Sequence, residues 1–273
     1  MRLSVREMIF DIEVSGSESG APVLLLHGFP EDRHCWAGVT PVLGAAGFRT
    51  FAPDQRGYSP GARPADVAGY RQPELVADAL ALADALGLGT FHLVGHDWGA
   101  LVGWQLAARY PSRIRTLTAV SVPHPLAMAE VLVVDPKQRE RSAYFELFRQ
   151  PGVAEETLLA DGQAWLRDLL AGCPPEHTER YLARLREPGA LTAALNWYRA
   201  VTGEDVAGTG KVPVPTTFVW SDGDVYVGRA AAERCATKVA GPYRFAVLPG
   251  VSHWVPEQAP AELARVILSG TAG

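Results

Sequence analysis

The chain has 273 residues, with 30 acidic side chains, 25 lysines and arginines, and a formal net charge of −5 at pH 7. This length suits one large α/β domain or a domain with an insertion, and the charge excludes the basic surface expected of a nucleic-acid-binding protein. The three cysteines, Cys35, Cys173 and Cys235, are scattered, so we expect reduced thiols and neither a disulfide framework nor a zinc site. We find no signal-peptide core and no apolar run of about 20 residues, so we expect a cytoplasmic protein without a membrane partner.

The first 120 residues predict alternating strands and helices. Residues 3–14 alternate as one half-exposed strand, followed by a turn at 16–20, and Leu75–Leu86 is a strongly periodic helix closed by Gly87. Further strands are expected at Pro22–Leu26, Phe48–Ala52, Phe91–Val94 and Ile114–Val120. Several of these runs are continuously apolar, as in strands covered on both faces. The pattern predicts a mostly parallel, doubly covered sheet.

The alternation stops after residue 125 and resumes near residue 212. Between these points the chain predicts helices only, at Arg139–Arg149, Glu155–Leu170, Glu176–Arg186 and Ala190–Ala200. A strand at 212–220, a helix at 229–239, a strand at 243–248 and a helix at 260–268 follow. We therefore predict an α/β core of residues 1–126 and 209–273, with an all-helical cap of residues 127–208 inserted after the sixth strand.

Residues 91–102 carry the first functional signal. A run of β-formers meets Gly95, and Gly99 opens an apolar helical run, so Gly-x-Asp-x-Gly stands between a strand and a helix. This is the layout of a nucleophile elbow, with Asp97 in the place of the usual serine. Glycines suit such a turn because it needs backbone freedom and close approach of strand and helix. An aspartate that merely caps the helix would give the same local pattern.

Two later loops supply partners for Asp97. Asp222 and Asp224 follow the strand that ends near Trp220, and His253 follows the strand that ends near Leu248. Loops after parallel strands converge on the carboxyl edge of a sheet, and the order nucleophile, acid, histidine is that of α/β-hydrolases. We expect a catalytic triad.

With these motifs the chain resembles the α/β-hydrolase superfamily, and within it the epoxide hydrolases, over nearly its whole length. The His-Gly-x-Pro loop of that family is residues 27–30, its Asp-x-Arg-Gly stretch is residues 54–57, and its aspartate elbow is residues 95–99. The resemblance implies that Asp97 is the nucleophile, Asp224 the triad acid and His253 the base. Asp222 is the weaker candidate, because it stands two residues early and could simply shape the turn.

The resemblance also implies two cap tyrosines that hold and protonate the epoxide oxygen. Tyr144 precedes the family's Gln-Pro-Gly-Val-Ala-Glu run, at residues 150–155, and Tyr181 lies upstream of Leu-Asn-Trp-Tyr-Arg, at residues 195–199. Buried tyrosines that only pack are the structural alternative. Tyr198 and Tyr226 are not selected.

Family placement further assigns the oxyanion-hole N–H groups to Phe29 and Trp98, and places His27, Pro30 and Trp197 at the substrate pocket. It implies opening of an epoxide to a vicinal diol through an alkyl ester of Asp97, with an epoxide and water as partners. No cofactor and no metal is expected, and the oligomeric state could be monomer or homodimer.

Two other functions remain open at this point. A haloalkane or haloacid dehalogenase would use the same Asp97, Asp224 and His253. However, haloalkane dehalogenases often carry Asn where Phe29 stands, and haloacetate enzymes carry Arg where Trp98 stands. A non-catalytic binding protein with this fold is the remote alternative, because fold alone does not decide function.

Overall fold

The computed structural model describes residues 1–271, and within them eight strands form one sheet of order β1-β2-β4-β3-β5-β6-β7-β8. The pairings β1–β2 and β2–β4 are antiparallel, and the pairings from β4 through β3 to β8 are parallel. The strands are β1 (Arg2–Val5), β2 (Met8–Gly16), β3 (Ala21–Leu26), β4 (Phe48–Pro53), β5 (Phe91–His96), β6 (Ile114–Val120), β7 (Thr216–Ser221) and β8 (Tyr243–Leu248). The predicted α/β class and mostly parallel sheet are confirmed.

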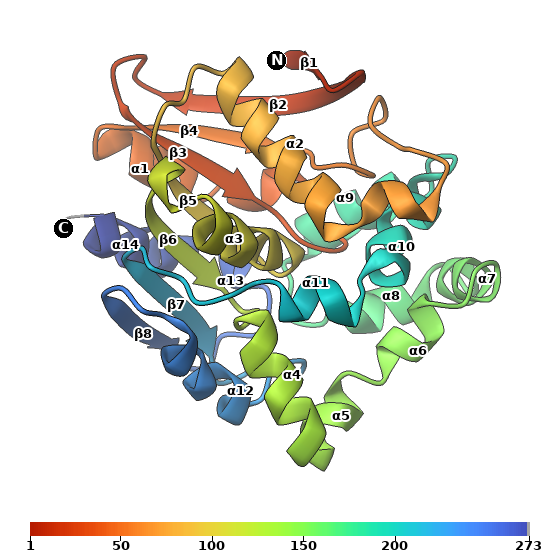
Figure 1. Ribbon diagram of the computed structural model, residues 1–273. Coiled ribbons are helices and arrows are strands. Elements are labelled where there is room, and N and C mark those ends of the chain that lie inside the picture. The colour runs from red at the N-terminus through yellow and green to blue at the C-terminus, as the bar shows by residue number, and fades with distance from the viewer. Residues whose placement is uncertain (272–273) are drawn as a thin grey trace.

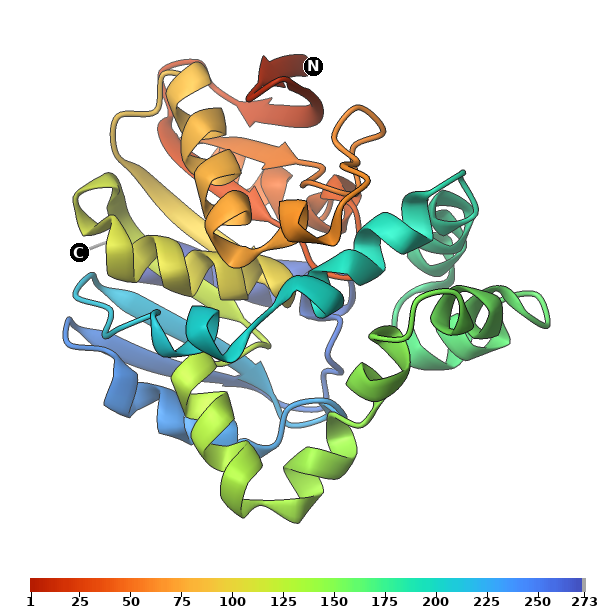
Figure 2. The same cartoon turned by 45° about the vertical axis from the view of Figure 1, so that its right-hand side comes forward.

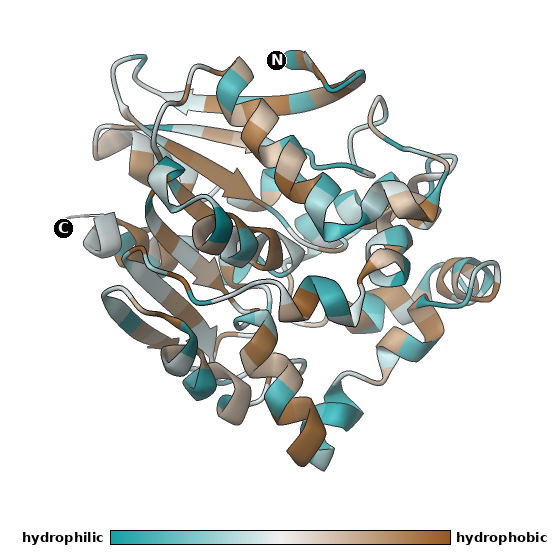
Figure 3. Cartoon of the chain, viewed as in Figure 1, coloured by the Kyte–Doolittle hydropathy of each residue, from teal (hydrophilic) through white to brown (hydrophobic). Residues whose placement is uncertain are grey.

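Helices cover both faces of this sheet. In Figure 1, α2 and α3 lie in front of the strands, and α1 and α14 lie behind them. The core helices are α1 (Thr40–Ala45), α2 (Gln72–Ala85), α3 (Trp98–Arg109), α12 (Arg229–Arg234), α13 (Val255–Gln258) and α14 (Pro260–Thr271), with short 3₁₀ turns at Arg33–Trp36, Val67–Tyr70, Pro111–Arg113 and Cys235–Lys238. All six residues of β5 and of β7 are buried, and the central strand β3 is strongly apolar in Figure 3. Double coverage explains these apolar strands, because neither face meets water.

The helices between β6 and β7 form a separate group beside the carboxyl edge of the sheet (Figures 1 and 2). They are α4 (Pro125–Val134), α5 (Pro136–Arg141), α6 (Tyr144–Phe148), α7 (Val153–Leu159), α8 (Ala164–Leu169), α9 (Pro175–Leu185), α10 (Ala190–Ala200) and α11 (Gly203–Ala207). The sequence prediction for α10 has the observed bounds, and that for α9 is off by one residue at each end. The cap boundaries at residues 127 and 208 stay predictions.

The local predictions fail where turn residues interrupt a pattern. The strand predicted at residues 3–14 is a hairpin of β1 and β2, because Arg6 and Glu7 turn the chain with φ of 51° and 63°. The helix predicted over 155–170 breaks between α7 and α8, where Asp161 and Gln163 are left-handed. The helix predicted over 139–149 divides into α5 and α6, and the strand predicted from residue 212 begins only at Thr216. Pro213 and Pro215 precede that start, and proline cannot donate a ladder hydrogen bond.

In residues 1–271 no helix is both long and apolar enough to span a bilayer.

Candidate active site

Asp97 occupies a strained turn between β5 and α3. Its backbone has φ 50° and ψ −118°, a conformation that non-glycine residues rarely adopt and that clusters at functional sites. A Cβ on Gly95 would overlap the backbone at Gly99, and a Cβ on Gly99 would overlap the Leu26 carbonyl. Both positions therefore need glycine, and the turn presents the Asp97 side chain beyond the end of the sheet, as the nucleophile elbow predicts.

The loop after β3 packs directly on this side chain. Because β3 and β5 are neighbours in the sheet, their following loops meet at its carboxyl edge. The Phe29 N–H donates to Asp97 Oδ1 at 2.8 Å, and a Cβ on Gly28 would overlap the Asp97 side chain. Phe29 thus holds the place predicted for an oxyanion-hole donor. Trp98 is the first residue of α3, and such a position has no intrahelical acceptor for its N–H.

The loops after β7 and β8 bring an acid and a histidine to Asp97. His253 Nε2 lies 3.5 Å from Asp97 Oδ2, and His253 Nδ1 lies 2.8 Å from Asp224 Oδ2. The other Asp224 oxygen accepts the N–H groups of Tyr226 and Val227 at 2.7 and 3.0 Å. These bonds fix the Asp224 carboxylate, which in turn orients the imidazole toward Asp97. The three residues predicted as a triad therefore lie together, with His253 between Asp97 and Asp224.

Asp222, the weaker acid candidate, lies apart from the histidine. Its Oδ1 accepts the Gly250 N–H at 2.6 Å, which joins the turn after β7 to the turn after β8. This contact fits the alternative in which Asp222 shapes the turn and takes no part in the triad.

Burial and neighbouring charges decide the protonation states of Asp97 and His253. Burial alone would raise the pKa of the Asp97 carboxyl, but hydrogen bonding and the charge of His253, with the Phe29 N–H, bring this pKa below its usual value. Burial alone would lower the pKa of His253, but Asp224 and Asp97 outweigh burial and raise this pKa to about 10. The site at neutral pH therefore pairs an ionised carboxylate with a charged imidazole.

A cavity of about 450 Å³ opens on Asp97 and His253. Its walls come from α3, from α4 to α6 and from α11, and they include Leu101, Val122, Met128, Leu132 and Val206. Tyr144 and Tyr226 also line it. The reacting groups therefore face a mostly apolar space large enough for a small organic molecule.

Tyr144 lies in this cavity as predicted. Burial, with the Asp97 carboxylate, raises the pKa of the Tyr144 phenol well above its usual value. The Tyr144 ring packs on Phe145, Phe148 and Tyr198, with centroids 5.0, 5.2 and 6.2 Å away. The phenol therefore stays protonated next to the carboxylate and can donate a proton to a bound oxygen.

Tyr181 does not lie in the cavity with Tyr144, which corrects the prediction that Tyr181 is the second tyrosine of the site. The Tyr181 hydroxyl donates to Glu257 Oε1 at 2.7 Å, and it lies 3.4 Å from His177 Nδ1. In residues 1–271, Tyr181 is absent from the lining of the cavity. The physical reason is the direction of the side chain, which extends from α9 toward α13 in the core instead of toward Asp97.

Tyr198 on α10, which the sequence analysis set aside, lies nearer to the nucleophile. Its ring centroid is 4.8 Å from that of Trp98 and 5.3 Å from that of Phe29. Burial, together with Tyr144 and Asp97, raises the pKa of Tyr198 well above its usual value, whereas Asp97 is not a cause of the rise at Tyr181. Like Tyr181, Tyr198 is absent from the lining of the cavity in residues 1–271, but it packs on Trp98 and Tyr144, which do line it. The motif at residues 195–199 contains this tyrosine, but a helical pattern does not say which buried side chain lies beside the nucleophile.

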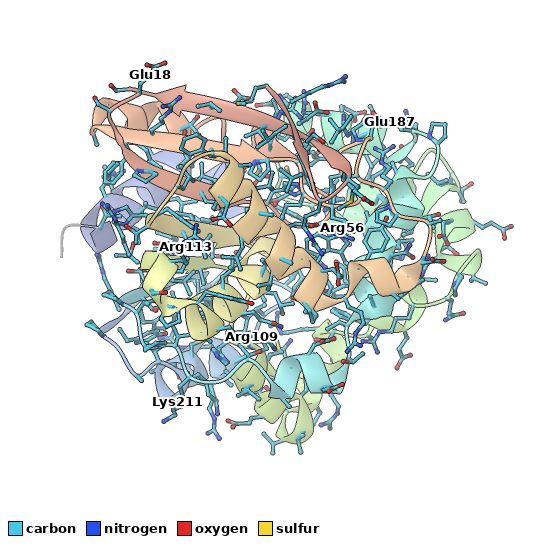
Figure 4. All side chains as sticks on the ribbon, turned by 45° about the horizontal axis from the view of Figure 1, so that its top comes forward. Glu18, Arg56, Arg109, Arg113, Glu187 and Lys211 are labelled. Atoms are coloured by element: carbon cyan, nitrogen blue, oxygen red, sulfur yellow. The ribbon has the colours of Figure 1, made fainter. Side chains whose placement is uncertain are left out.

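The other predicted pocket residues support the site from behind. His27 contacts the Gln55 N–H through Nε2 at 3.1 Å, and the Trp197 indole donates to the carbonyl of Arg56, which is labelled in Figure 4, at 2.9 Å. In the described part of the chain, neither residue nor Pro30 lines the cavity. The pocket assignment of His27, Pro30 and Trp197 is corrected, because none of the three is on the cavity wall. The bonds of His27 and Trp197 hold adjacent loops together instead.

No group of three or more His, Cys, Asp or Glu side chains in residues 1–271 is arranged to hold a metal ion.

Comparison with known proteins agrees with this geometry. Residues 21–260 match the family described as alpha/beta hydrolase fold. Epoxide hydrolase A of Mycobacterium tuberculosis is 32% identical over 305 aligned residues, which cover 95% of this chain and 93% of that protein. AB hydrolase superfamily protein YfhM of Bacillus subtilis is 33% identical over 264 residues, covering 94% and 92%. A solved epoxide hydrolase of Bacillus megaterium in complex with an inhibitor has a TM-score of 0.90 at 25% identity and covers both chains completely. The chain belongs to the epoxide hydrolase family of the α/β-hydrolase superfamily and is a hydrolase.

Proposed function

We propose that this enzyme opens an epoxide to a vicinal diol through a covalent ester on Asp97. The observation that carries the proposal is that the Asp97 carboxylate, His253 and the Tyr144 phenol line the same apolar cavity. A carboxylate suits displacement at a saturated carbon, and it needs no base to activate it. The named activity of relatives that match more than nine-tenths of the chain supports the same reaction.

In the first step, an Asp97 oxygen attacks one epoxide carbon, and the strained C–O bond of that carbon breaks. The electron pair of the broken bond stays on oxygen, which takes a proton from a phenol. Tyr144 is one proton donor, and we assign the second position to Tyr198 in place of Tyr181. The ring contacts of Tyr198 with Trp98 and Phe29 place it beside the elbow.

In the second step, water hydrolyses the ester. Alkylation removes the negative charge of Asp97, which is one cause of the raised pKa of His253. The pKa of His253 therefore falls in the intermediate, its proton passes through water to the phenolate left by the first step, and the neutral imidazole then takes a proton from the attacking water. The hydroxide oxygen attacks the Asp97 carboxyl carbon, and the oxyanion accepts the Phe29 N–H and, by family placement, the Trp98 N–H. Collapse of the tetrahedral intermediate breaks the C–O bond to the substrate, and the departing alkoxide takes the hydroxyl proton of that intermediate. The diol leaves, and Asp97 and His253 return to the carboxylate and charged imidazole of the resting site.

Isotope labelling tests the covalent route. After a single turnover in ¹⁸O-water, we expect label in the peptide that carries Asp97, together with diol formed from an aryl or alkyl epoxide. Mass spectrometry of the digested protein measures the label. Diol without label in that peptide would contradict the ester, and release of halide from haloalkanes with no diol would assign the site to dehalogenation.

The two proposed proton donors make a separate prediction. Tyr144→Phe and Tyr198→Phe should each slow formation of the ester, and the double variant should slow it by about 10²–10⁴-fold, the range of general acid catalysis. Rapid-quench mass spectrometry of the alkylated enzyme measures this step. Tyr181→Phe is the matched control, because it removes the same hydroxyl group from a buried tyrosine that is bonded to Glu257 instead of packing on the elbow. Equal slowing by Tyr181→Phe and Tyr198→Phe would contradict the revised assignment.

The proposal also covers the need for a cofactor and the cellular compartment. Both steps use protein groups and water, so the reaction needs no cofactor. The three cysteines are free thiols, which fits a reducing compartment such as the cytoplasm.

A further inference from the structure

One cap helix, α9, makes polar contacts with the residues around the oxyanion donor. We define the oxyanion segment as residues 28–33, which follow β3 and contain Phe29. Arg180 of α9 donates through Nε to Asp32 Oδ2 at 2.8 Å. One turn later, Arg184 donates through Nη2 to Asp54 Oδ2 at 2.9 Å, while Asp54 Oδ1 accepts the Arg33 N–H at 2.9 Å. Two arginines of α9 thus hold the far end of the oxyanion segment.

The near end of the segment is reached through a row of buried polar groups inside the protein. The Tyr181 hydroxyl donates to Glu257 Oε1 at 2.7 Å, and Glu257 lies close enough to Glu31 that this second carboxyl group is, after burial, one cause of its raised pKa. Glu31 Oε2 in turn accepts the Gly28 N–H at 2.7 Å. Gly28 is bonded directly to Phe29, so the row from α9 ends one peptide unit from the donor that faces Asp97.

These carboxyl groups are deeply buried. Glu31 and Asp54 are fully inaccessible, and Asp32 and Glu257 are 1% and 7% exposed. A buried carboxyl that loses a partner is costly, so the contacts resist independent movement of helix and loop. Burial raises the pKa of Glu31 to about 8 and that of Glu257 well above its usual value, so these two neighbouring carboxyl groups do not both carry a negative charge at neutral pH.

We propose that α9 is a positioning clamp: Arg180, Tyr181 and Arg184 hold the oxyanion segment so that the Phe29 N–H stays directed at the Asp97 carboxyl group. Tyr181 is then a positioning residue that acts through Glu257 and Glu31, and not a proton donor to substrate. The cap would contribute to the second half-reaction as well as covering the cavity. This inference rests on the proposed ester mechanism.

The two half-reactions depend differently on such a clamp. The Phe29 N–H stabilises the oxyanion that forms during ester hydrolysis. During alkylation the same N–H binds the attacking carboxylate and offers no comparable gain, because negative charge leaves Asp97 in that step. Loosening the oxyanion segment should therefore slow ester hydrolysis selectively.

The test measures both half-reactions in Tyr181→Phe and Arg180→Met by rapid-quench mass spectrometry with styrene oxide as the probe. We expect ester hydrolysis to slow by roughly 10-fold, which is less than the ~10²–10³-fold loss for a deleted oxyanion donor, and alkylation to change by less than about 2-fold. Arg180→Lys, which keeps the charge facing Asp32, should recover part of the hydrolysis rate. The folded fraction, measured by thermal unfolding, separates these rate changes from loss of structure.

Arg71→Met is the matched control, because Arg71 Nη2 joins the core to Asp205 of α11 at 3.4 Å without contact to the oxyanion segment. Both of its rates should equal those of the unchanged enzyme. Glu187, labelled at the edge of the cap in Figure 4, is less suitable, because it contacts Arg184 as well as Arg63.

Equal slowing of the two steps, or unchanged hydrolysis in both clamp variants, would overturn the clamp. Absence of any alkylated intermediate in the unchanged enzyme would instead overturn the ester mechanism, so the two failures are distinguishable.

Discussion

Asp97→Ala should lower epoxide turnover by about 10⁴-fold or more, in line with removal of a nucleophile from other hydrolase triads. The variant lacks the atom that attacks the epoxide. Among residues 1–271 the other carboxylate paired with His253 is Asp224, which is already bonded to His253 and to the N–H groups of Tyr226 and Val227. Steady-state diol formation measures the loss, and circular dichroism checks the fold.

Asp222→Ala is the matched control for this change. It removes an aspartate from the same edge of the sheet, but Asp222 Oδ1 accepts the N–H of Gly250, whereas His253 is bonded to Asp224. We expect near-normal turnover, with a modest loss of thermal stability. Substantial diol formation by Asp97→Ala would contradict the nucleophile, and loss of activity in Asp222→Ala would reopen the choice of triad acid.

His253→Gln should separate the two half-reactions. Asp97 needs no base for attack, so alkylation should continue, whereas water should lack a base in the second step. General base catalysis contributes about 10²–10⁴-fold, and a loss of that size in hydrolysis should trap the ester. We expect one equivalent of alkylated protein, with the mass of the epoxide added to the peptide carrying Asp97.

His92→Gln provides the comparison for the trapping experiment. His92 lies in β5, where Nδ1 contacts Thr116 Oγ1 at 2.9 Å, and burial lowers its pKa to about 4, so it is already neutral at pH 7. This variant should turn over without accumulating ester. Rapid complete turnover in His253→Gln, with no adduct, would contradict the role of His253 as base.

The positions of the three triad residues are predictable from the sequence, because each depends on a short local pattern. Each of Asp97, Asp224 and His253 follows a strand, and parallel strands direct their following loops to one edge of the sheet. The observed contacts of His253 with Asp97 and Asp224 agree with this expectation, although the helix predicted over 155–170 is wrong where Asp161 and Gln163 turn left-handed.

The second tyrosine of the site could not be predicted correctly from the sequence. Tyr181 and Tyr198 lie on α9 and α10, whose bounds were predicted within one residue, and they are 0% and 2% exposed. A helical pattern predicts that both are buried, but it does not distinguish the surfaces against which they are buried. Tyr181 meets Glu257 of the core, and Tyr198 meets Trp98 beside the nucleophile.

Residue order and strand-end positions were enough for the α/β class, the aspartate elbow, the acid and the histidine, since these follow from backbone periodicity and from the handedness of parallel sheets. The choice of second tyrosine, the corrected pocket lining and the contacts of α9 with the oxyanion segment depend on how the cap packs on the core. Such contacts join residues as much as 148 positions apart, and their geometry depends on the packing of whole helices, which no local pattern contains.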